Sequence, residues 1–167
     1  MTDEVKRNYL EINSIKDLIE TNQSFHDFSI VLIDPINFQL NKFFYKNIGK
    51  KHRWVDRLTW SEQQWIDYVS NSKVKTYVLK KKDDLVGFFE LIFHLENKEV
   101  EIAYFGILEE YQNKKLGSFL LSEAIKKSFN ENINRVWLHT CSLDHENALK
   151  NYLARGMKIF KSEIFKI

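Results

Sequence analysis

The sequence predicts a mixed α/β fold in which helices cover both faces of one sheet. Three apolar, strand-like runs follow one another at residues 74–80, 85–95 and 99–108, separated only by short polar segments. Amphipathic segments with capping signals lie on both sides of these runs, and further strand-like segments lie near both ends. Strands and helices that alternate in this way are typical of a sheet packed between helical layers.

The N-terminal segment favours short elements. Residues 9–12 alternate as a short strand does, and residues 14–21 begin with the polar residues that open a short helix. Residues 28–33 are apolar and rich in β-branched side chains, which is typical of a buried strand.

Two helices are expected next. Asp34 and Pro35 predict a helix start, with Asp34 as the N-cap and Pro35 at the first helical position, and Gly49 marks the end of that helix. Residues 61–64 fit a capping box, which predicts a second helix that runs to about Val69.

The remaining elements follow from turns and periodicity. Polar turns at residues 82–84 and 96–98 join the three central runs, so we expect an antiparallel meander there. The further elements expected are an amphipathic helix at 116–129, a strand at 135–141, a helix from Asp144 to Gly156, and one or two strands within 157–167.

Composition favours one folded domain in a reducing compartment. A chain of 167 residues with 44% hydrophobic residues can bury about 70% of its unfolded surface in a single core. Cys141 is the only cysteine, and the first residues lack the apolar core of a signal peptide. We expect a single domain spanning 1–167, with 1–27 as an N-terminal extension and 28–167 as the core, in the cytoplasm.

The charge balance argues against two classes of partner. The 25 basic and 23 acidic side chains give a net charge of +2, too balanced for a nucleic-acid-binding or membrane-binding surface. The longest apolar run, residues 85–95, is interrupted by Glu90 and His94 and is about half the length that a bilayer requires. We expect neither nucleic acid nor membrane as a partner.

The segment 107–118 is the most informative part of the chain. It joins the end of a strand to the start of a helix through a polar loop that contains Lys114, Lys115 and Gly117. Free backbone amides and the helix dipole at such a junction can bind a phosphate group, and lysines would add charge-assisted contacts. Without further information, a solvated loop with ordinary surface lysines is the simpler interpretation.

Two motifs in this order resemble the GNAT N-acetyltransferases. Residues 112–117 are similar to the family's pyrophosphate loop, Q/R-x-x-G-x-G/A, and residues 145–157 to its second motif, N-x-x-A-x-x-x-Y-x-x-x-G-F. The sequence departs from these patterns at Lys115, His145 and Met157, which replace a glycine, an asparagine and a phenylalanine. Residues 101–106 and 137–145 are similar to one bacterial subgroup whose acceptor is unassigned.

The resemblance implies a mixed, mostly antiparallel sheet of six to seven strands and acetyl-CoA as co-substrate, with no metal. It also implies a group of residues that contact the cofactor. These are Phe105, Ile107, Gln112, Asn113, Lys114, Lys115, Leu116, Gly117, Ser118, Asn147 and Asn151.

The implied reaction is direct attack of a primary amine on the thioester, which needs a base for the amine and an acid for the thiolate. Glu90 and Glu101 are carboxylates within apolar strands. Strand alternation would place Glu101 on one face with Ala103 and Phe105, where desolvation should raise its pKa towards a base's range. We expect Glu101 to be the base, with Glu90 as the alternative, although either could instead be satisfied by an arginine. Tyr152 matches the family's general acid.

Four residues are candidates for the acceptor site. Trp54 and Arg57 could stack on an acceptor and clamp its carboxylate, although core packing with an Arg57 ion pair explains them slightly better. Tyr104 should lie nearby, and His139 is a candidate of second rank. We expect Cys141 to be an inert core residue. The spacing of His139, Asp144 and His145 does not fit a metal site.

Three function classes remain at this point. An acetyltransferase is favoured, a non-catalytic acyl-CoA-binding or sensing module is the alternative, and a structural dimerisation domain would leave the 112–118 loop without a ligand. The acceptor is expected to be a small-molecule or peptide amine, and the chain could form a homodimer.

Overall fold

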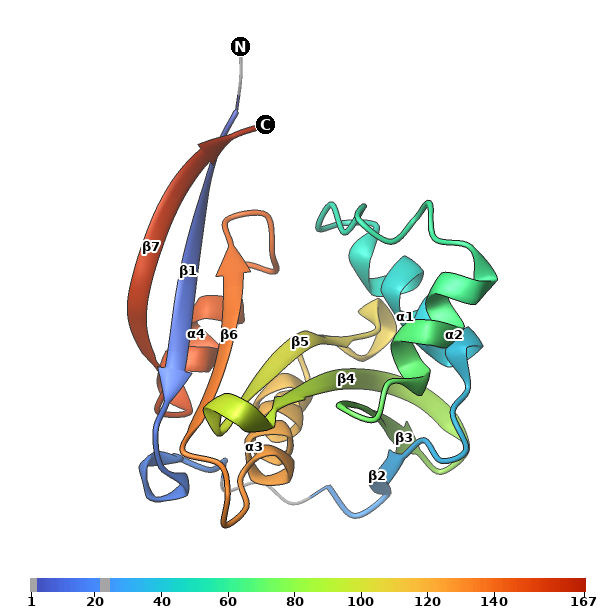
Figure 1. Ribbon diagram of the computed structural model, residues 1–167, viewed down its shortest axis with the longest axis horizontal. Helices are drawn as coiled ribbons and strands as arrows, with labels where there is room; N and C mark the ends of the chain where they lie inside the picture. Colours follow the sequence, from blue (N-terminus) through green and yellow to red (C-terminus); the bar gives the residue numbers. More distant parts are fainter. Residues whose placement is uncertain (1–2, 22–24) are drawn as a thin grey trace.

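The computed structural model of this protein describes residues 3–21 and 25–167. Seven strands form one sheet in the order β2-β3-β4-β5-β6-β1-β7 (Figure 1). Neighbouring strands are antiparallel except β5 and β6, which are parallel. The mixed α/β class and the mostly antiparallel sheet of six to seven strands are therefore confirmed.

The expected order of the main elements is also found. The strands are β1 (Glu4–Ile12), β2 (Phe28–Leu32), β3 (Val74–Lys81), β4 (Asp84–His94), β5 (Glu99–Ile107), β6 (Arg135–Cys141) and β7 (Lys158–Lys166). The α-helices are α1 (Phe38–Gly49), α2 (Glu62–Ser70), α3 (Leu116–Ser128) and α4 (Ala148–Ala154). Short 3-10 turns are η1 (Ile15–Asp17), η2 (Leu95–Asn97) and η3 (Glu109–Tyr111). Among the described residues, no helix combines the length and the apolar character needed to cross a bilayer.

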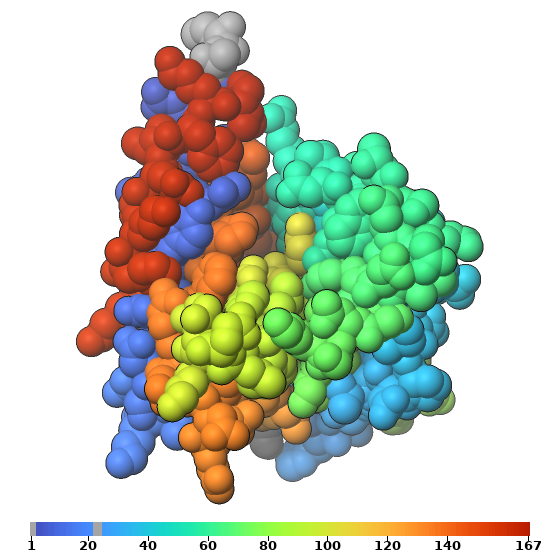
Figure 2. Space-filling view, in the orientation of Figure 1, coloured from blue at the N-terminus to red at the C-terminus, as the bar shows by residue number. Residues whose placement is uncertain are grey.

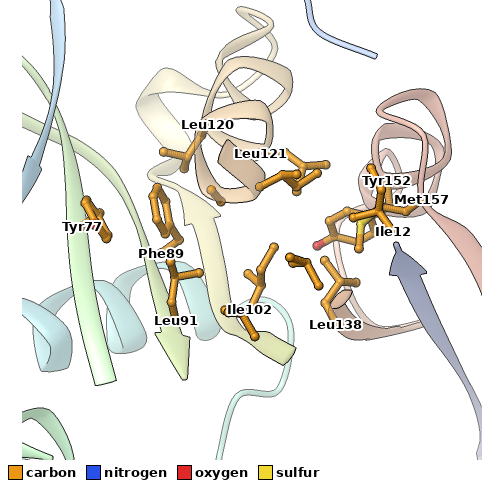
Figure 3. Packing of buried hydrophobic residues seen from close by; sticks show 14 of the residues in the cluster. Ile12, Tyr77, Phe89, Leu91, Ile102, Leu120, Leu121, Leu138, Tyr152 and Met157 are labelled. Carbon is orange, nitrogen blue, oxygen red and sulfur yellow. The ribbon is translucent and has the colours of Figure 1, made fainter. Parts of the chain in front are cut away.

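Helices cover both faces of the sheet, as expected. On one face, Leu120 of α3 lies beside Phe89 of β4, and Tyr152 of α4 lies beside Ile12 of β1 and Leu138 of β6 (Figure 3). On the other face, α1 packs against β3, β4 and the end of β5 in a smaller cluster. Because burial of apolar surface is the main stabilising contribution to folding, the larger cluster fixes α3 and α4 against the strands that carry the site.

The N-terminal third differs from the sequence-based expectations. The predicted helix at 14–21 is only the single turn η1, and α1 begins at Phe38 rather than at Pro35. Asn37 is the N-cap, since its side chain accepts a hydrogen bond from the backbone of Gln39. The strand predicted as buried at 28–33 is β2, an edge strand whose side chains are all at least partly exposed. A β-branched run therefore marked a strand here, but not its depth.

Asp144 does not cap a helix. Its carboxylate instead accepts hydrogen bonds from the Thr140 hydroxyl (2.5 Å) and the Cys141 backbone (2.9 Å), which secures the turn after β6. The helix begins later, with Asn147 at its N-cap position, and ends at Ala154. By contrast, the capping box of Ser61 and Gln64 at the start of α2 forms as expected.

The segment 1–27 contributes a strand to the interior of the sheet. β1 lies between β6 and β7 and pairs with both. The side chains of Leu10 and Ile12, on one face of β1, are buried in the main core. The predicted boundary at residue 28 therefore assigns β1 to the N-terminal extension, although β1 is hydrogen-bonded to β6 and β7 of the predicted core.

A β-bulge in β5 changes which residues share a face. Glu90 pairs with Tyr104 and Leu91 pairs with Ile102, so Ala103 has no partner on β4. The extra residue interrupts the alternation. Glu101, opposite Ile92, therefore lies on the same face as Tyr104, and not with Phe105, which packs on the main core. The predicted grouping of Glu101 with Phe105 was wrong for this reason.

The turn after α4 requires glycine. Gly156 has φ +103, and a Cβ at this position would lie 2.2 Å from the backbone oxygen of Asp17. We predict that Gly156→Ala lowers the free energy of unfolding by about 3 kcal/mol, because backbone strain and a contact with rigid backbone add together. Urea denaturation measures this change.

Gly117→Ala is the matched control for stability. Gly117 is helical, and its added Cβ would meet only the Asn151 side chain at 3.6 Å. That variant should stay within about 1 kcal/mol of the wild type. Equal effects of the two substitutions would contradict the requirement for glycine at 156.

Candidate active site

The central feature of the site is a cleft that opens where β5 and β6 separate. The two parallel strands pair only from Glu99 and Arg135 to Glu101 and Trp137, although β5 continues to Ile107 and β6 to Cys141. Beyond this pairing they diverge (Figure 1). The cleft has a volume of about 1180 Å³, above the usual range for drug-sized ligands. Figure 2 shows a hollow between the segment around α1 and α2 and the strands at the C-terminal end of the chain.

The cleft reaches the N-terminus of α3. Lys115 occupies the N-cap position with φ 63, and no side chain caps the helix. Asn113 also has a left-handed backbone, with φ 63. Since the first amides of a helix have no intrahelical partner, the start of α3 offers donors and a positive dipole end to the cleft. The left-handed conformation also explains why glycine suits position 115 in the motif and why lysine there costs backbone strain.

Most of the residues predicted to contact a cofactor line this cleft. They are Phe105, Ile107, Gln112, Asn113, Lys115, Leu116, Gly117, Ser118, Asn147 and Asn151. Two hydrogen bonds hold the loop in place: the Gln112 side chain donates to the Ile107 carbonyl (3.2 Å), and the Ser118 hydroxyl donates to Asn151 Oδ1 (3.1 Å). Lys114 is the exception, because it does not line the cleft and its ammonium lies 5.5 Å from the centre of the Tyr111 ring.

Glu101 and Tyr152 face the cleft from different elements. Glu101 comes from the floor strand β5, and its side chain is 20% exposed. Tyr152 comes from α4 and is buried, with its ring 6.3 Å from that of Phe105. Burial raises the pKa of Tyr152 above its ordinary value, and the nearby Asp144 adds to the effect. The phenol therefore keeps its proton throughout the neutral range.

Glu90 lies elsewhere, in a buried polar network. Its carboxylate is fully buried and accepts hydrogen bonds from Arg57 Nη1 (2.9 Å), the Tyr68 hydroxyl (2.7 Å) and the Asn41 amide (2.9 Å). Asn41 also donates to Thr76. Glu90 does not line the cleft, so its predicted role as the alternative base does not agree with this position. Glu90 instead matches the other alternative considered from the sequence, a carboxylate that an arginine satisfies.

Arg57 is held within an aromatic cage. Its guanidinium lies 4.2–5.6 Å from the ring centres of Tyr45, Trp60, Trp65, Tyr68 and Tyr104. The side chain is 7% exposed. Although burial opposes its charged form, Glu90, Tyr68 and Tyr104 raise the pKa of Arg57. Arg57 lines the cleft, and its charge is already paired with Glu90, so a carboxylate of an acceptor would have to compete with that pair.

The other predicted acceptor residues also line the cleft. The rings of Trp54 and Tyr104 are in edge contact, 4.9 Å between centroids, and form one wall. His139 lies on β6 opposite Tyr9 of β1. Part of its ring reaches solvent, yet the surrounding protein, and secondarily Arg7, lower the pKa of His139. At neutral pH the imidazole is therefore uncharged.

Several residues that line the cleft were not predicted from the sequence, among them three with ionisable side chains. Arg7 of β1 and Asp56 of the loop before α2 line it, and His52 Nδ1 lies 3.0 Å from the Leu143 carbonyl, joining loops on opposite sides. No local motif marks these residues, since each reaches the cleft only through strand order or loop contact. In the described part of the chain, no group of three or more histidine, cysteine or acidic side chains could hold a metal.

Comparison with known proteins decides the family. The sequence profile of the acetyltransferase (GNAT) family matches residues 38–157, which is most of the chain. The chain belongs to the GNAT acetyltransferase family. No curated protein matches it. Family membership supports acetyl transfer from acetyl-CoA in general terms.

Solved structures show the same fold at low identity. A GCN5-related N-acetyltransferase from Sphaerobacter thermophilus has a TM-score of 0.71 and 11% identity, covering 99% of this chain and 53% of that one. A conserved protein of unknown function from Staphylococcus epidermidis has a TM-score of 0.65 and 18% identity, with 98% and 61% covered. A GNAT family protein from Streptococcus pneumoniae has a TM-score of 0.58 and 20% identity, with 80% and 87% covered. The GNAT chain thus spans little more than half of the first two proteins.

The buried pair Arg57–Glu90 gives a test of the cleft wall. We predict that Arg57→Met lowers the free energy of unfolding by about 3–5 kcal/mol, because it leaves a buried carboxylate without its cation. The double variant Arg57→Met/Glu90→Gln should lose less than the sum of the two single variants. Urea denaturation of all four proteins measures the coupling, and additive effects would show that the two side chains act independently.

Proposed function

We propose that this protein transfers an acetyl group from acetyl-CoA to a primary amine by direct attack of the amine on the thioester. The observation that carries the proposal is one continuous cleft that joins the uncapped start of α3 to Glu101 and Tyr152. A phosphate-binding end and an acid–base pair in the same cleft suit a large anionic co-substrate and proton transfer.

The chain's own residues fit the co-substrate. The amides at the start of α3 and the Lys115 ammonium would bind the pyrophosphate. The edge of β5 beyond Glu101 has no partner on β6 and lines the cleft, so its backbone groups can hydrogen-bond the amide-containing arm. Phe105 and Ile107 would contact that arm from the same strand.

The positions of the two groups support separate acid and base roles. Glu101, which lines the cleft from β5, would accept a proton from the incoming ammonium. Tyr152 would donate its proton to the sulfur as the C–S bond breaks, and its raised pKa keeps it protonated until then. Trp54 and Tyr104 would orient the acceptor, which we propose to be a small-molecule or peptide amine, with His139 as a neutral wall residue.

Acetyl-CoA should bind and stabilise the protein. At a hundredfold excess over its dissociation constant we expect about 2.7 kcal/mol of stabilisation, seen as a rise in Tm. Gly117→Glu should abolish that rise while the far-UV dichroism stays unchanged, because it places a carboxylate among the phosphate-binding amides. Gly117→Ala, which adds only a methyl group, is the control and should keep the shift. Indifference of the wild type to millimolar acetyl-CoA would overturn the proposal.

Two conservative substitutions test the acid–base roles. Glu101→Gln should lower kcat by about 10²–10⁴-fold and remove the acidic limb of the pH–rate profile, because the amide cannot accept the proton. Tyr152→Phe should lower kcat with little change in acetyl-CoA binding, because the ring contact remains. Steady-state assays of CoA release measure both effects.

The same assays separate the alternatives. Normal binding of acetyl-CoA without transfer to any amine class would favour a non-catalytic sensing module. Nearly wild-type activity in Glu101→Gln would mean that the amine arrives deprotonated and that positioning alone accelerates the reaction.

A further inference from the structure

Glu101 has a partner outside the cleft. The Nε2 atom of His94, at the end of β4, lies 3.3 Å from Glu101 Oε1. The two side chains are 30% and 20% exposed. They come together because β4 and β5 form a hairpin in which His94 is opposite Glu99 and Ile92 is opposite Glu101. This diagonal arrangement brings side chains of adjacent strands within reach on one face of a sheet.

The two groups have different access to the substrate. Glu101 lines the cleft, whereas His94 does not. The imidazole adjoins the turn η2, which follows it directly at Leu95–Asn97. Glu101 therefore contacts the cleft while its carboxylate oxygen meets an imidazole with its own exposure to water. A titratable group in this position can carry a proton between the two.

The proposed reaction must release one proton. An ammonium acceptor loses two protons as its nitrogen forms the C–N bond of the amide. One of them replaces the proton that Tyr152 gives to the departing thiolate as the C–S bond breaks. The other has to leave the cleft for solvent, or Glu101 stays protonated and cannot serve the next turnover.

We propose that His94 is the proton-relay residue of the active site. Glu101 takes a proton from the acceptor ammonium, passes it to Nε2 of His94, and the imidazolium releases it to water. The proposal rests on the proposed acetyltransferase function and on the role of Glu101 in it.

The other carboxylates near His94 are paired with cations, so Glu101 is the carboxylate that contacts the imidazole. Glu99, directly opposite on β5, is bound by Arg135 Nη1 at 2.8 Å, and Arg135 also binds Glu11. Glu96 of the adjoining turn faces Lys73 at 3.8 Å. Each of these carboxylates is balanced by a cation, so Glu101 is the carboxylate that the imidazole contacts directly.

The test compares three variants in the acetyl-CoA-dependent assay. His94→Ala should lower kcat about tenfold or more with an unchanged KM for acetyl-CoA, and it should shift the acidic limb of the pH–rate profile. Added imidazole should restore part of the lost rate. His94→Gln keeps a hydrogen bond to Glu101 but cannot carry a proton, so it should be as slow as His94→Ala. His26→Gln, outside the cleft and the hairpin, is the control for loss of a histidine.

The outcomes separate the two proposals. A wild-type rate and profile in His94→Gln would show that the imidazole only orients the carboxylate, which overturns the relay while the acetyltransferase proposal stands. A slow His94→Ala that imidazole does not rescue would also overturn it. A wild type that releases no CoA with any amine overturns the proposed function and the relay together.

Discussion

The site depends on one constraint in the sheet, namely that β5 and β6 are parallel neighbours that pair over only three residue positions. Antiparallel pairing holds the strands on either side of this junction together over much longer stretches. The sheet therefore opens between the two strands that share the shortest pairing, and backbone groups of β5 are left without strand partners. A cleft formed in this way supplies polar backbone edges deep in the molecule, where loops alone would rarely place them.

The remaining parts of the site are arranged around that opening. The β-bulge at Ala103 turns Glu101 and Tyr104 to the same face, so that the carboxylate and the aromatic wall share one compartment. The end of β5 leads through η3 directly to the start of α3, which brings uncapped helical amides to the other end of the same cleft. One strand thus connects the end of the cleft at α3 with the end at Glu101, and their spacing is fixed by strand geometry.

The two buried or half-buried carboxylates show how environment separates roles. Glu90 accepts hydrogen bonds from Arg57, Tyr68 and Asn41 and has no contact with the cleft. Glu101 has one imidazole partner and an open side. A carboxylate whose lone pairs are all engaged in the core stabilises a particular packing, at a desolvation cost that its partners offset. A carboxylate with a free side can exchange protons with a ligand.

The class of fold, most element boundaries and the loop before α3 could be predicted from the sequence, because these depend on local signals. The capping box at Ser61, the turns of the meander and the loop before Gly117 are each encoded within a few residues. Which of Glu90 and Glu101 faces the cleft depends on tertiary contacts, because Arg57, which is distant in the sequence, engages Glu90 in the core and leaves Glu101 as the carboxylate that lines the cleft. The tertiary structure also brought His94 to Glu101, a contact that hairpin pairing allows but that alternation alone does not specify.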